Sequence, residues 1–181
     1  MIPFILVGPD KMPQAWADPG YNRVLWIQSP NCDLRPPTAV VDTVVLHATV
    51  ISTLQGVVER FQSPEHKVSS HYTIGKDGSV VQHVSRFNRA WHAGKSKDVE
   101  GRTHVNDFSI GIELVNLNDG KDPYPLPQTT VLRNLIMALR KSLPLRYVTS
   151  HEYVAVPPGR KTDPLAYPWK TLENLGLHLV P

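Results

Sequence analysis

Two histidines and one aspartate of this sequence could together hold a metal ion. His151 and Asp163 share one stretch of chain, and His47 follows an apolar, β-branched run at residues 44–46 far upstream. Two imidazoles and one carboxylate make a three-ligand zinc set that leaves a fourth position for water, which is typical of a hydrolytic rather than a structural zinc site. A strand end and a loop are places where sites are usually built.

Lys161 and Glu113 could supply the remaining chemistry. Lys161 lies two residues before Asp163, where its charge would repel a bound cation unless it stabilises a developing oxyanion. Glu113 interrupts an apolar strand, and because strand residues alternate between faces, it points away from the face that Ile112 and Leu114 share. A carboxylate near an activated water can act as general base and then return the proton to a leaving amine.

Simpler structural roles remain open for several of these residues. His47 could be a hydrogen-bonded core histidine, Asp163 could form an Asx-type turn before the following proline, and Glu113 could face solvent. His92 lies between a tryptophan and a glycine-containing turn, which suits the wall of a cleft. For His71, within a predicted strand, the structural role is favoured.

The composition is that of one ordinary globular domain. The chain has 181 residues, of which 41% are hydrophobic and 19% charged, enough for a sizeable core. Its net charge of +3 comes without a run of Lys or Arg, so we expect no nucleic-acid partner. The single cysteine, Cys32, excludes an intramolecular disulfide and a multi-cysteine zinc site. No membrane span or signal peptide is recognisable, which predicts a cytoplasmic protein that does not contact membranes.

The pattern along the chain predicts an α/β fold in a single domain over residues 1–181. Residues 1–40 are rich in proline and are expected to form an irregular arm, with the catalytic core at residues 41–176. Asp77-Gly78 between two alternating segments is typical of a β-hairpin. Strands interleaved with two good helices indicate a sheet with helices on its faces. Strands are predicted at residues 43–47, 71–75, 79–84, 108–115 and 145–149. One helix is predicted to be capped by Ser52 and ended by Pro64, and two others are predicted at residues 129–141 and 169–175.

Five segments, in order, resemble the zinc-dependent N-acetylmuramoyl-L-alanine amidases, the family that includes peptidoglycan recognition proteins and phage lysozyme-type amidases. The resemblance is closest to the cytoplasmic branch, the 1,6-anhydro-N-acetylmuramyl-L-alanine amidases of bacterial peptidoglycan recycling. Each segment is weakly specific alone, and five in order are highly specific. The segments are VVLH at 44–47, VSSHY at 68–72, RAWHAG at 89–94, NDFSIGIEL at 106–114 and GRKTDP at 159–164.

This resemblance implies a central mixed β-sheet flanked by helices, and hydrolysis of the amide between the lactyl group of N-acetylmuramic acid, or its 1,6-anhydro form, and L-alanine of the stem peptide. The partner would be a muropeptide or peptidoglycan, and we expect a monomer. The implied zinc ligands are His47, His151 and Asp163, the implied catalytic pair is Glu113 and Lys161, and the implied substrate contacts are Lys67, Tyr72, Trp91, His92 and His104.

Two alternatives belong to other functional classes. A non-catalytic peptidoglycan-binding module would not need Glu113 and Lys161, which are both present. A phage or envelope lytic amidase would act on polymeric wall. The lack of a recognisable leader or wall-binding repeat favours the recycling role.

Overall fold

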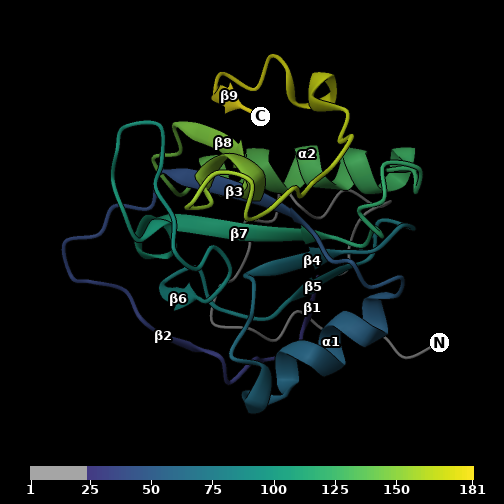
Figure 1. Ribbon diagram of the computed structural model, residues 1–181, viewed down its shortest axis with the longest axis horizontal. Coiled ribbons are helices and arrows are strands. Elements are labelled where there is room, and N and C mark those ends of the chain that lie inside the picture. The colour runs from purple at the N-terminus through teal and green to yellow at the C-terminus, as the bar shows by residue number, and fades with distance from the viewer. Residues whose placement is uncertain (1–23) are drawn as a thin grey trace.

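A seven-stranded mixed sheet crosses the centre of the molecule in the computed structural model, which describes residues 24–181 (Figure 1). All neighbouring strands pair in parallel except β4 and β5, which form the hairpin predicted around Asp77-Gly78. The mixed α/β sheet is therefore confirmed. In order across the sheet the strands are β1 (Val24–Trp26), β5 (Val80–Gln82), β4 (Tyr72–Ile74), β7 (Ser109–Leu114), β3 (Thr43–Ala48), β8 (Tyr147–Ser150) and β9 (His178–Val180).

The alternation of side chains along β3 and β7 gives the sheet two different faces. Val44, Leu46, Ile110 and Ile112 point to one face and join the largest hydrophobic cluster. Helix α2 (Leu126–Arg140) covers that face with an apolar stripe that includes Leu135. The opposite face carries the polar residues of the same two strands, so one period-two pattern supplies both the core and the candidate site.

Helix α1 (Leu54–Gln62) covers part of the second face, where it buries Val57 and Phe61 against Val115. The side chain of Thr53, rather than the predicted Ser52, caps α1 by accepting a hydrogen bond from the N–H of Gly56 at 3.1 Å. Shorter helical turns lie in the connections: η2 (Pro64–His66), η3 (Val105–Phe108), α3 (His151–Val154) and η4 (Trp169–Leu172).

Several boundaries differ from the prediction. Two strands lie within residues 1–40, which were expected to be irregular: β1 adds to the main sheet, and β2 (Cys32–Leu34) pairs antiparallel with β6 (Asn88–Ala90). Helix α2 begins three residues early, because its prolines fall in the first turn, where no N–H is needed. Residues 1–23 of the predicted arm lie outside the described residues. Within residues 24–181, no helix has both the length and the apolar character needed to cross a membrane.

Candidate active site

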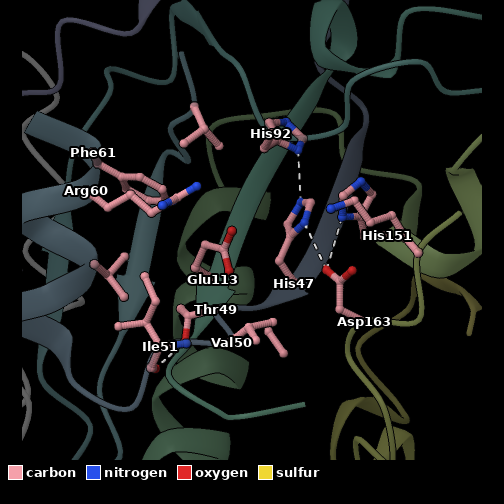
Figure 2. Close-up of a pocket in the computed structure, with 14 residues that line it drawn as sticks. His47, Thr49, Val50, Ile51, Arg60, Phe61, His92, Glu113, His151 and Asp163 are labelled. Carbon is pink, nitrogen blue, oxygen red and sulfur yellow. Dashed lines mark hydrogen bonds and ion pairs between the residues drawn. The ribbon is translucent and has the colours of Figure 1, made fainter. Parts of the chain in front are cut away.

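His47, His151 and Asp163 converge at the carboxyl ends of two neighbouring parallel strands. His47 is the penultimate residue of β3, and His151 opens helix α3 directly after β8. Asp163 Oδ2 lies 3.4 Å from Nδ1 of His47 and 3.1 Å from Nδ1 of His151 (Figure 2). One candidate ligand atom from each residue lies within 4.8 Å of the others, and all three side chains are buried. The carboxyl ends of parallel strands are where such folds place their sites.

Local hydrogen bonds bring the loop that carries Asp163 to this strand end. The hydroxyl of Ser150 caps α3 by accepting from the N–H of Tyr153 at 2.9 Å, which fixes the turn that carries His151. The N–H of Glu152 donates to the carbonyl of Asp163 at 2.9 Å. The loop is also tied at Asn118, whose side-chain oxygen accepts from the N–H of Leu165 at 2.7 Å. The ligands are therefore placed by the fold itself.

The electrostatics of the three residues suit a divalent cation. Burial, with the neighbouring His151, lowers the pKa of His47 to about 4, so this imidazole is neutral at pH 7 and keeps a lone pair. Burial opposes ionisation of Asp163, but hydrogen bonds with His151 and His47 outweigh it and hold the pKa of this carboxyl well below its usual range. Two nitrogen donors and one ionised carboxylate form a set that fits a metal such as zinc.

Glu113 lies directly beside His47, since the two are register partners on β7 and β3. Its side chain is partly exposed, but Oε2 is buried and has no hydrogen-bond partner among the described residues. Burial raises the pKa of Glu113 to about 8, the charge of Asp163 adds to this effect and that of Lys161 opposes it. The pKa of Glu113 thus lies close to neutral pH, where a residue that both accepts and donates a proton works best.

These residues open into one pocket of about 370 Å³. Lys161 is among the lining residues. The wall opposite His47 comes from α1 and its neighbouring loops (Figure 2). Besides Lys161 the lining residues are His47, Ala48, Thr49, Val50, Ile51, Val57, Arg60, Phe61, Val68, His92, Glu113, His151 and Asp163.

The predicted substrate contacts are distributed unevenly around this pocket. His92 lines it but is buried, and its ring contacts His47. Tyr72 lies in the hydrophobic cluster against α2, on the opposite face of the sheet, which leaves a contact with substrate without structural support. Lys67 and His104 are exposed and Trp91 is half-buried, and none of these three lines the pocket. Their contacts with substrate stay predictions.

Sequence reasoning missed Arg60, which lines the pocket from the last turn of α1. The periodicity of α1 gave its apolar stripe, but it did not indicate which residues beside the stripe would border a cleft. A cation next to the core-facing Phe61 was the available signal.

Comparison with known proteins agrees with this site. The family model Amidase_2, described as N-acetylmuramoyl-L-alanine amidase, matches residues 37–166, a stretch that contains the metal-ligand set together with Glu113 and Lys161. The 1,6-anhydro-N-acetylmuramyl-L-alanine amidase AmpD of Haemophilus influenzae is 33% identical over 161 residues, covering 78% of this chain and 85% of the relative. AmpD of Escherichia coli K12 is 43% identical over 108 residues, covering 57% of this chain and 55% of the relative.

Solved structures show the same fold. A crystal structure of a selenomethionine AmpD derivative superposes with a TM-score of 0.73 at 30% identity, covering 85% of this chain and 94% of that one. The amidase AmiD of E. coli, solved with anhydro-N-acetylmuramic acid-L-Ala-D-γ-Glu-L-Lys, gives a TM-score of 0.66 at 27% identity, over 79% of this chain and 61% of that one. From the family match over most of its length, together with these relatives, the chain belongs to the N-acetylmuramoyl-L-alanine amidase family.

Proposed function

We propose that this chain hydrolyses the amide between the lactyl group of 1,6-anhydro-N-acetylmuramic acid and L-alanine in soluble muropeptides, using zinc held by His47, His151 and Asp163. The observation that carries the proposal is the buried His-His-Asp set with Glu113 beside it in one pocket, the buried Oε2 of Glu113 having no hydrogen-bond partner within residues 24–181. The names of the AmpD relatives, and the anhydromuramyl peptides bound to AmiD and to AmpDh3 of Pseudomonas aeruginosa, support this substrate class.

In this mechanism bound zinc supplies a Lewis acid and lowers the pKa of water at the site. Glu113 accepts a proton from the attacking water as the new C–O bond forms at the amide carbon. The ammonium of Lys161 stabilises the negative charge that develops on the carbonyl oxygen. Glu113 then gives its proton to the alanine nitrogen as the C–N bond breaks. The products are the anhydromuramyl acid and the free stem peptide.

The direct test is to incubate the purified protein with a synthetic anhydromuramyl tripeptide and to separate the products by liquid chromatography with mass spectrometry. We expect cleavage at the lactyl–alanine amide, loss of turnover with a chelator, recovery with zinc, and about one zinc per chain by metal analysis. Activity that persists unchanged in a metal-free preparation would overturn the metal assignment.

The same assay with intact sacculi tests the two alternatives, a lytic amidase that acts on polymeric wall and a non-catalytic binding module. Comparable turnover of sacculi and soluble muropeptide would identify a lytic amidase, and binding without cleavage would identify a recognition module. We further propose, from the resemblance to the recycling branch, that the protein acts in the cytoplasm as a monomer. Cell fractionation and size-exclusion chromatography test these two points.

A further inference from the structure

Both histidines of the proposed metal site direct Nε2 toward one two-residue segment, His92–Ala93. Nε2 of His47 lies 3.0 Å from Nδ1 of His92 (Figure 2). Nε2 of His151 lies 3.4 Å from the carbonyl oxygen of Ala93, which also accepts from Arg160 at 3.0 Å. The Nδ1 atoms of both ligands face Asp163 instead.

The protons of this network can be assigned by following it from its far end. The hydroxyl of Ser109 lies 2.6 Å from the carbonyl of Val105, which can only accept, so the single hydroxyl proton lies on that bond. Nε2 of His92, 3.1 Å from the same hydroxyl, must therefore donate to it. A neutral His92 then has a bare Nδ1, which accepts the Nε2 proton of His47. The lone pair of His47 remains at Nδ1, where a metal would bind.

His151 differs, because its Nδ1 lies 3.1 Å from the ionised carboxylate of Asp163, which can only accept, so in the metal-free protein its proton faces Asp163. A metal bound at that Nδ1 would leave the proton on Nε2, facing the carbonyl of Ala93. The segment that both Nε2 atoms face is itself fixed. The N–H groups of His92 and Ala93 both donate to the side-chain oxygen of Asn106, at 3.3 and 2.8 Å. The His92 ring packs against Gly111 so closely that a Cβ at that position would lie 2.5 Å from it.

We propose that His92 is a positioning group that holds His47 in the tautomer with Nδ1 free for the metal, and that the carbonyl of Ala93 accepts the Nε2 proton of His151 once a metal occupies its Nδ1. This inference rests on the proposed metal site. It also explains why a strand next to the reaction centre carries Gly111, since any side chain there would displace the His92 ring. Removing such a partner of a ligand usually weakens metal binding about 10- to 100-fold.

The test measures zinc affinity by competition with a chelator, without substrate. His92→Phe keeps the ring but removes the acceptor, and we expect Kd to rise about 10- to 100-fold. His83→Phe is the matched control: His83 is buried and bonded to Thr73, and we expect no change. Unchanged affinity in His92→Phe would overturn the proposal.

A second measurement needs no variant to fold. Nitrogen-15 NMR of the metal-free wild-type protein should show His47 protonated at Nε2, and protonation of His47 at Nδ1 would refute the assignment. Ser109→Ala, which frees the tautomer of His92, should weaken zinc binding less than His92→Phe does. Because zinc alone is the ligand measured, the result does not depend on the amidase substrate being correct.

A different observation concerns the α1 wall of the pocket, which carries a cation that the mechanism does not use. Figure 2 shows the guanidinium of Arg60 extending from α1 toward Glu113. Within the described part of the chain, no hydrogen bond or ion pair joins Arg60 to another residue. Its neighbours on this wall, Ile51, Val57 and Val68, are apolar. An exposed cation on a wall with apolar side chains fits a ligand with one carboxylate on a hydrocarbon chain.

The chemistry of the proposed substrate indicates which half of the muropeptide Arg60 would bind. The lactyl carboxyl is consumed in the scissile amide, so the muramyl half is uncharged. A γ-linked glutamate in the second peptide position, as in the AmiD ligand, leaves its α-carboxylate free. We infer, resting on the proposed function, that Arg60 binds this α-carboxylate and that the α1 wall holds the stem peptide.

The test compares two muropeptides that differ only at this group, one with the γ-linked glutamate and one with its α-carboxamide. Arg60→Gln should raise KM about 10-fold for the carboxylate and leave kcat unchanged, while the carboxamide substrate should lose little, since its charge is absent. Lys141→Gln, an exposed cation at the end of α2, is the control. An equal effect of Arg60→Gln on both substrates, or no effect on either, would overturn the inference. Failure of the wild-type protein to cleave either substrate would instead refute the proposed function.

Discussion

Replacing Glu113 by glutamine should stabilise the metal-free protein while it removes activity. A glutamate in the unfolded chain titrates near 4.5, and burial raises the pKa of Glu113 in the folded protein to about 8. Between pH 4.5 and pH 8 the folded protein binds a proton at Glu113 that the unfolded chain does not bind. The stability that Glu113 contributes is therefore fully present below pH 4.5 and is lost as the pH rises to 8. Glutamine does not titrate and escapes this cost.

The size of the gain follows from the two pKa values. At about 1.4 kcal/mol for each tenfold change in ionisation, the cost at pH 7 is about 3 kcal/mol. The side chain is partly exposed, so we expect about 1–3 kcal/mol, or roughly 3–10 °C in Tm for a chain of this size. The gain should be near zero at pH 4.5 and largest at pH 8.

Thermal unfolding of chelator-treated wild-type and Glu113→Gln proteins at pH 5 and pH 8 measures this difference. The reasoning is refuted if the variant gains equally at both pH values, or if it is the less stable protein at pH 8. With zinc restored, the variant should bind a normal amount of metal and lose at least about 10²-fold in kcat, the usual contribution of a positioned acid or base. A variant with a near-normal rate would show that another group moves the proton.

Four further substitutions test other parts of the structure. His47→Ala or Asp163→Ala should abolish zinc binding and turnover together, since two ligands leave a weak site; metal analysis beside activity checks this. Lys161→Ala should retain zinc and lose about 10²- to 10³-fold in kcat, whereas loss of both would mean that this lysine mainly holds the loop in shape. Arg102→Met should cost about 2 kcal/mol in denaturant unfolding, because it leaves the buried carboxylate of Asp42 without its 3.0 Å partner; a cost below about 0.5 kcal/mol would contradict this pairing.

The sequence was sufficient to predict the parts of the structure that depend on regular periods. The apolar alternation of β7 placed Glu113 on the face opposite the core, as the structure shows. The hairpin at Asp77-Gly78 follows from turn chemistry that is local to four residues. Helix α1 followed from its apolar spacing, but the cap predicted at Ser52 was wrong by one residue, since Ser and Thr both accept a backbone N–H and Thr53 is the one that does so.

Features that depend on distant partners could not be predicted. Strands β1 and β2 are three residues long, so they show no period, and they exist because β5 and β6 offer edges to them. The burial of Tyr72 depends on its register with Ile112, forty positions away in the chain. The role of His92 was missed for the same reason: its neighbours in sequence suggested a cleft wall, but its function is decided by His47 and Ser109, which only the fold brings to it.

The register that pairs His47 with Glu113 has a consequence for how this enzyme can be altered. The separation between the proposed metal ligand and the proposed proton carrier is fixed by two adjacent parallel strands, about 4.8 Å apart, and not by the chain that connects them. Residues 49–68, which include α1 and most of the far pocket wall, can therefore be exchanged for a segment of different length or charge without moving the reacting groups. Natural variation and engineering can thus change which peptide is accepted while the hydrolytic chemistry stays in place.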